Sequence, residues 1–212
     1  MIRGLIVREW VLISKRLVIY SSAIYLLVLL AIVLAIGKNA EVLPLVGPGI
    51  IWSLLVMCGL FMSPGLIEQD YRDGFLDQLV SLRVPLVYWV LVKWLSLWVT
   101  VALPPLLMVP LAMGLFCIPV PLIGSFLIKF FVGSLYMVLQ SVLGSALILG
   151  SQRNHMWGYF LMMPMIVPVL IVPTLPIPTG EAILLLSGGL LLVAPLYIFL
   201  TAQAVRYHIT CS

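Results

Sequence analysis

The stretch Ile67–Pro85, IEQDYRDGFLDQLVSLRVP, is the most polar part of an otherwise apolar chain. Six of the eighteen Asp, Glu, Lys and Arg residues of the protein fall between positions 68 and 83. A charged side chain at the centre of a bilayer costs roughly 2.5–3.5 kcal/mol. The stretch is therefore predicted to lie outside the hydrocarbon, between two long apolar runs that are predicted to lie in it.

The second half of this stretch has the pattern of a short amphipathic helix. After Gly74, apolar residues recur at three- and four-residue spacing, with polar residues between them. Asp73 is the expected N-cap, and Pro85 is expected to prevent continuation past Val84. The pattern gives an apolar ridge and an acidic front. We interpret the segment as a docking helix; the alternative is that the ridge rests on the protein's own helices.

The composition excludes an ordinary soluble domain. Of 212 residues, 64% are hydrophobic and 8% are charged, against about 25% charged in soluble domains. The net charge of +4 comes from basic residues scattered at the ends of apolar runs, so no nucleic-acid partner is expected. We predict an all-α polytopic membrane protein that forms a single integral-membrane domain over residues 1–212.

The apolar runs predict six transmembrane helices, which are long enough to cross a hydrocarbon core of about 30 Å. Their expected bounds are about 17–36, 49–67, 87–116, 122–150, 156–175 and 182–205. Residues 1–16 are expected to form an amphipathic helix in the membrane interface, or else a basic flank that only orients the first span. Lys93, near the start of the third span, is expected to snorkel back towards water.

The distribution of basic residues predicts the orientation. If the N-terminus is cytoplasmic, only Lys38 and Lys129 fall outside, and nine basic residues fall inside. Both termini are then cytoplasmic, and the polar stretch becomes a cytoplasmic coupling helix between spans 2 and 3. The nine are Arg3, Arg8, Lys15, Arg16, Arg72, Arg83, Lys93, Arg153 and Arg206.

Prolines interrupt two of the expected spans. Because proline removes a backbone donor, the freed carbonyls must be satisfied by neighbouring helices or line a cavity. Both outcomes are open from the sequence. The candidates for a groove are Pro104, Pro105, Pro164 and Pro168.

Catalytic and cofactor-binding residues are not evident. His155 and His208 have no acid, Ser or Cys at a suggestive spacing, and no metal-binding motif is present. The only Gly-Lys pair, Gly37-Lys38, lacks the rest of a phosphate-binding loop. We therefore expect no enzymatic activity and no directly bound cofactor.

Three sequence blocks resemble the CcmB (haem exporter protein B) family. They are GPGIIW (47–52), EQDYRDGFLDQL (68–79) and VKW (92–94). The family carries a PGIIW-like start to the second span and a D-G-x-L-[ED]-Q-L signature in the first cytoplasmic loop. Asp77 stands where Glu is more frequent, which preserves the charge.

This resemblance implies the permease subunit of an ABC transporter for cytochrome c maturation. The implied partners are a CcmA-type ATPase that binds ATP, CcmC- and CcmD-type membrane subunits and a CcmE-type haem chaperone. ATP hydrolysis by the partner would drive release of haem-loaded chaperone or haem export. The implied location is the bacterial inner membrane, or the mitochondrial inner membrane if the protein is organelle-encoded. A scaffold that assembles membrane partners without transport is the alternative.

The residues expected to contact the ATPase subunit all lie in the polar stretch. Phe75, Leu79 and Leu82 are expected to fill a cleft in the partner, while Asp73 and Asp77 set its orientation. The full set is Glu68, Asp70, Asp73, Gly74, Phe75, Leu76, Asp77, Gln78, Leu79 and Leu82.

Overall fold

The structure is a computed structural model that describes residues 15–37, 41–149, 167, 170–171 and 179–211. Within these residues every regular element is a helix, which confirms the all-α prediction for this part of the chain. The helices are α2 (Lys15–Ile36), α3 (Val42–Arg72), α4 (Phe75–Ser81), α5 (Leu86–Leu97), the π-helix η1 (Trp98–Ala102), α6 (Leu103–Leu115), the 3-10 turn η2 (Val120–Leu122), α7 (Ile123–Leu147) and α9 (Thr179–Cys211).

Five stretches of these helices are long and apolar enough to cross a membrane, so the protein is a multi-pass membrane protein. They are Val18–Ile36, Val42–Gly59, Leu86–Leu115, Val120–Leu147 and Gly180–Ile209. They match five of the six expected spans. The interfacial helix expected over 1–16 lies almost wholly outside the described residues, and so does most of the span expected over 156–175.

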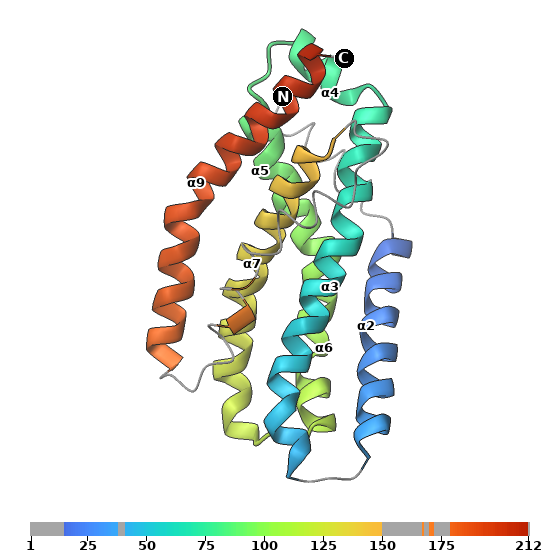
Figure 1. Ribbon diagram of the computed structural model, residues 1–212, viewed down its shortest axis with the longest axis vertical. Coiled ribbons are helices and arrows are strands. Elements are labelled where there is room, and N and C mark those ends of the chain that lie inside the picture. Colours follow the sequence, from blue (N-terminus) through green and yellow to red (C-terminus); the bar gives the residue numbers. More distant parts are fainter. Residues whose placement is uncertain (1–14, 38–40, 150–166, 168–169, 172–178, 212) are drawn as a thin grey trace.

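The helices form an elongated bundle (Figure 1). α3, α6 and α7 lie in its middle, with α2 and α9 at its two sides. α4 lies at one end of the bundle, next to the C-terminal end of α9. We call this the α4 end. The opposite end, where α2 and α6 finish, is the far end.

Glycines bring α3 and α7 close together at two levels. A β-carbon added to Gly133 of α7 would overlap the indole ring of Trp52 on α3. Another, on Gly59 of α3, would come within 2.6 Å of Met137 Cε on α7. Trp52 also packs on the Phe130 ring, with centroids 5.0 Å apart. Small residues at the contact let two spans pack by van der Waals contact, as is common between membrane helices.

α3 corrects both predicted boundaries of the second span. The span was expected to cover residues 49–67, but the helix begins at Val42, before Gly47-Pro48, and continues past Ser63-Pro64-Gly65 to Arg72. Its 31 residues correspond to about 46 Å at 1.5 Å per residue, well beyond a hydrocarbon core of about 30 Å. The charged residues 68–72 therefore form the last turns of a rigid helix rather than the start of a loop.

The proline pair of the third span produces a π-helix instead of a break. Pro104 has no N–H with which to bond the carbonyl of Thr100, and the backbone widens over Trp98–Ala102, just before the pair. The Thr100 carbonyl instead lies 3.4 Å from Ser21 Oγ on α2, whose one hydroxyl proton it shares with the Val18 carbonyl at 3.0 Å. Pro104 and Pro105 are both buried. The carbonyl that Pro104 leaves free is thus contacted by a neighbouring helix, while Pro164 and Pro168 lie outside the described residues.

Candidate coupling site at the α4 end

The turn between α3 and α4 depends on a glycine in the left-handed region. Asp73 closes α3, its N–H donating to the Gln69 carbonyl at 2.9 Å. Gly74 follows with φ of 68°, a conformation that costs a residue with a side chain about 1–2 kcal/mol. Gly74 itself is the N-cap of α4, so the expectation that Asp73 would cap this helix was wrong. The turn requires a residue that can adopt a positive φ, which glycine does without strain, and it does not use a capping side chain.

α4 ends in a Schellman motif, in which two crossed hydrogen bonds close the last turn. The N–H of Val84 donates to the Leu79 carbonyl at 3.0 Å, and that of Arg83 donates to the Val80 carbonyl at 2.9 Å. Arg83 occupies the left-handed position, with φ of 53°, where glycine is usual. Helix α4 is therefore fixed at both ends by left-handed residues, one glycine and one arginine.

The two faces of α4 divide the predicted contact residues. Leu76 and Leu79 are buried in the chain's own core, and Phe75 packs partly against the same core. Asp77 and Gln78 are exposed, and Leu82 is 70% exposed. The ridge of Phe75, Leu79 and Leu82 is thus not presented as a unit, because Leu79 faces α3 and the core. For Leu76 and Leu79 the structure favours the alternative, in which the ridge rests on the protein's own helices.

A buried ion pair joins α3 to α5 directly beneath α4. Lys93 Nζ lies 2.7 Å from Asp70 Oδ2, and the two side chains are only 6% and 2% exposed. The prediction that Lys93 snorkels to water was therefore wrong, and Asp70 faces inward instead of towards a partner. A desolvated charge is stable only next to its counter-charge, so the pair locks these two helices together.

The exposed side of α3 carries a different kind of ion pair. Arg72 Nη2 lies 2.6 Å from Glu68 Oε1, one helical turn away, and Arg72 is 69% exposed. Exposed pairs at this spacing contribute about 0.3–0.5 kcal/mol at most. Glu68 and Arg72 therefore shape the charge of the surface and add little to stability.

Two tryptophans connect α5 and η1 to α7. Trp94 Nε1 donates to the Leu135 carbonyl at 3.0 Å, and Trp98 Nε1 donates to Ser134 Oγ at 2.9 Å. Two neighbouring residues of the VKW block thus contact two different helices: Lys93 contacts α3, and Trp94 contacts α7. Sequence reasoning missed this role. The available signal was a lone lysine well inside an apolar run, because such a residue usually pairs with an acid.

The GPGIIW block serves packing at the other half of α3. A β-carbon on Gly47 would come within 2.8 Å of Phe116 at the end of α6, and Trp52 fits against Gly133. In the part of the chain that the structure describes, no three His, Cys, Asp or Glu side chains gather as a metal site would require. The chemistry of the α4 end is therefore that of charge pairing and of helix contacts.

Comparison with known proteins places these blocks in one family. The CcmB protein family model matches residues 7–207. Heme exporter protein B of Pseudomonas aeruginosa is 31% identical over 163 residues, which are 77% of this chain and 73% of that protein. Heme exporter protein B of Haemophilus influenzae is 27% identical over 189 residues, 86% of each chain. The Escherichia coli K12 protein of the same name is 34% identical over 84 residues, 40% of this chain and 38% of its own length. The match over nearly the whole length confirms the resemblance seen in the three blocks, and the chain belongs to the CcmB protein family.

Proposed function

We propose that this chain is the membrane subunit of an ABC transporter complex that handles haem in cytochrome c biogenesis. Its relatives are named heme exporter protein B, and the match covers most of their length. In this proposal, ATP hydrolysis by a partner subunit drives either release of haem-loaded chaperone or haem export. The chain itself contributes helices that move, and no enzymatic site.

The observation that carries the proposal is the continuous set of contacts from α4 to α7. α4 follows α3 after a two-residue turn, and Asp70 of α3 pairs with Lys93 of α5. Next to Lys93, Trp94 bonds the backbone of α7. A force applied to α4 would therefore reach three of the long helices without passing through a flexible loop. A force-transmitting subunit needs such a rigid path, whereas a passive anchor does not.

The surface offered to the ATPase subunit is the exposed face of α4 and its preceding turn. Asp73 and Asp77 are exposed and make no ion pair with any residue that the structure describes. Leu82 adds an exposed apolar side chain beside them. Two unpaired carboxylates around a single apolar contact suit a partner cleft lined by basic groups. Leu76 and Leu79 act from beneath by fixing α4 on the core.

A six-span topology with both termini cytoplasmic is part of this proposal. α7 ends towards the α4 end and α9 begins nearer the far end, which supports the proposal of one more crossing between them. The basic residues favour the cytoplasm for the α4 end, in the inner membrane of a bacterium. Cysteine labelling tests this: positions 77 and 153 should react only from the cytoplasmic side, and positions 41 and 181 only from outside.

The remaining partners follow from the family. A CcmA-type subunit would bind ATP, because this chain lacks a GxxxxGK[ST] loop. CcmC- and CcmD-type subunits and a CcmE-type chaperone would complete the complex and hold the haem. Pro164 and Pro168 remain candidates for the wall of a groove in the fifth span.

Charge reversal tests the ATPase contact. Asp73→Lys combined with Asp77→Lys should remove the ATPase subunit from affinity-purified complexes and abolish mature c-type cytochromes, because like charges would then face each other. The matched control is Glu41→Lys with Glu181→Lys, two exposed acids at the far end. The control should keep both the partner and the cytochromes.

Two results would contradict the proposal. If the reversed variant retained the ATPase subunit in full, the exposed face of α4 would not be its contact. If a hydrolysis-deficient ATPase subunit still bound and cytochrome production stayed normal, the chain would be a scaffold instead.

A further inference from the structure

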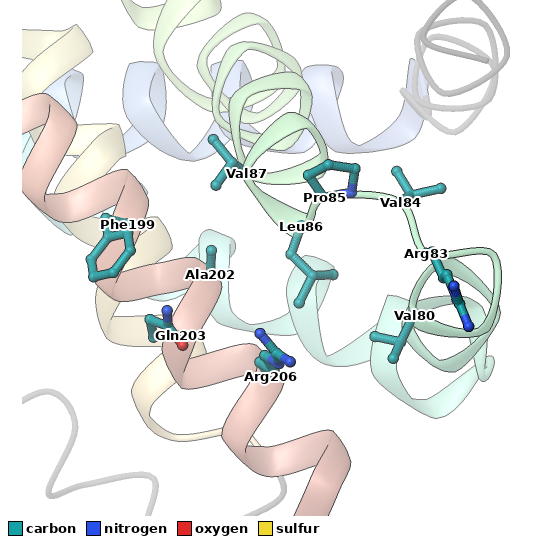
Figure 2. A pocket seen from close by; sticks show the side chains of 10 residues that line it. All are labelled: Val80, Arg83, Val84, Pro85, Leu86, Val87, Phe199, Ala202, Gln203 and Arg206. Carbon is teal, nitrogen blue, oxygen red and sulfur yellow. The ribbon is translucent and has the colours of Figure 1, made fainter.

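A groove at the α4 end has an amphipathic lining. It has a volume of about 410 Å³ and lies between the connection from α4 to α5 and the C-terminal part of α9. Its apolar wall includes Val80, Val84, Leu86, Phe199 and Ala202. Figure 2 shows Arg83 and Arg206 at its sides, with Val80 and Leu86 between them in this view. Gln203 is the third polar side chain of the lining, and no carboxylate takes part.

The depth of the groove places its arginines at a membrane surface. Leu86 begins one membrane-spanning stretch, and Arg206 lies in the last turn of another. Both arginines are exposed. At this depth a guanidinium meets lipid headgroups, while the apolar wall of the groove continues into the hydrocarbon.

Arg83 is held at this position at a cost in backbone strain. Its φ of 53° is one that glycine adopts freely and arginine adopts at about 1–2 kcal/mol. Its side chain makes no ion pair with any described residue, unlike Lys93 and Arg72 at the same end. The fold thus places a cation at the side of the groove, and no described residue provides an anion for it.

An apolar stripe leads from the arginines towards the bilayer centre. On α9, Arg206, Gln203, Phe199, Leu196 and Leu192 follow each other at alternating spacings of three and four residues, so they share one face. Phe199 and Leu196 are each 55% exposed, and Leu192 is 82% exposed. Two cations above a long exposed apolar stripe match an anionic head above an acyl chain.

We propose that this groove binds an anionic phospholipid of the leaflet at the α4 end, with the phosphate between Arg83 and Arg206 and one acyl chain along α9. Basic pockets between membrane helices are known to bind anionic headgroups. Because the groove borders both α4 and α9, a bound lipid would contact both helices and hold α4 in place against α9. This binding site is independent of the haem-handling role.

Native mass spectrometry of the detergent-solubilised full chain, with whatever partners remain bound, provides the test. Phosphatidylglycerol should bind more tightly than phosphatidylethanolamine. Arg83→Gln should weaken phosphatidylglycerol binding about fivefold, and the double variant with Arg206→Gln about thirtyfold, because each basic residue near an anionic lipid contributes about 1 kcal/mol. The control Arg72→Gln, at the same end but paired with Glu68 outside the groove, should leave the affinity unchanged.

Three results would overturn the proposal. Equal binding of the two lipids would show that the groove does not distinguish the charge of the headgroup. Full retention of phosphatidylglycerol by the Arg83→Gln variant would show that the lipid binds elsewhere. Displacement of the lipid by excess inorganic phosphate would show a simple anion site without an acyl-chain component. Arg83→Gln removes an exposed side chain without ion pairs, so its fold should persist, and a melting curve checks this.

Discussion

The α4 end and the far end close their helices with the same backbone device and then differ in side-chain chemistry. At the far end, α6 finishes with the N–H of Ile118 donating to Met113 and that of Cys117 donating to Gly114. Cys117 takes the left-handed position there, with φ of 54°, as Arg83 does after α4. The two turns are therefore equivalent in geometry, and function cannot be read from the backbone.

Charges separate the two ends. The α4 end holds a buried ion pair, an exposed ion pair, two acids that pair with no described residue and the arginines of the groove. The turn of the far end is closed by apolar contacts, with Phe116 fully buried against Gly47. The turn of the far end thus holds helices together by apolar packing, whereas the α4 end carries the exposed charges that the proposed ATPase contact would use.

The largest effect is expected from breaking the buried pair. Lys93→Met removes the ammonium group that lies 2.7 Å from the buried Asp70 carboxylate and should lower the free energy of unfolding by about 3–5 kcal/mol. Thermal denaturation in mild detergent measures this. Replacing both partners, with Asp70→Leu and Lys93→Met, should recover most of the loss, because a well-packed apolar pair substitutes for a buried ion pair.

The exposed pair supplies the control for that prediction. Arg72→Met should change stability by less than about 0.5 kcal/mol. If Lys93→Met were as mild as Arg72→Met, the pair would be solvated and would not lock α3 to α5.

Two glycines should differ in the size and the origin of their effect. Gly47→Ala at the far end places a β-carbon 2.8 Å from Phe116 Cβ and Cγ and should cost about 1–3 kcal/mol by overpacking. Gly74→Ala meets no atom within 4 Å, and its cost of about 1 kcal/mol should come from the left-handed backbone alone. Denaturation curves of both variants measure this, and Phe116→Gly in the same chain, which removes both Cβ and Cγ, should relieve only the first. Relief of both would show that space limits the two sites alike.

The smallest and most specific effect concerns the two non-glycine turns. Cys117→Gly and Arg83→Gly should each stabilise the fold by about 0.5 kcal/mol. Glycine removes the strain of the left-handed backbone, but it also increases the conformational entropy of the unfolded chain, which offsets part of that gain. Only Arg83→Gly should also reduce phosphatidylglycerol binding. Equal lipid binding by both variants would remove the functional difference between the ends.

Much of the fold could be predicted because membrane insertion follows local composition. Five of the six expected spans coincide with long apolar helices, and α4 lies where the spacing of apolar residues places a helix. The acidic front of α4 was also predicted, since Asp73 and Asp77 are exposed. These features depend on residues close together in the chain.

The orientation and the pairing of side chains could not be predicted in the same way. A helical stripe shows which residues share a face, but it does not show which face meets the core. Leu79 was therefore assigned to a partner, although the core buries it. The block at 68–79 likewise contains two acids in different environments, because Asp77 is exposed and Asp70 is buried. The sequence pattern did not distinguish them.

The sequence by itself determined that this protein lies in a membrane and that its charges gather at one end. A charge in hydrocarbon is costly wherever it stands, so composition along the chain decides its depth. Only the tertiary structure decided that Lys93 pairs with Asp70, that Ser21 contacts the carbonyl freed by Pro104, and that Arg83 and Arg206 line one groove. Each of these arrangements brings together residues far apart in the chain, because the free energy of a charge or a carbonyl depends on the neighbours that the packed bundle provides.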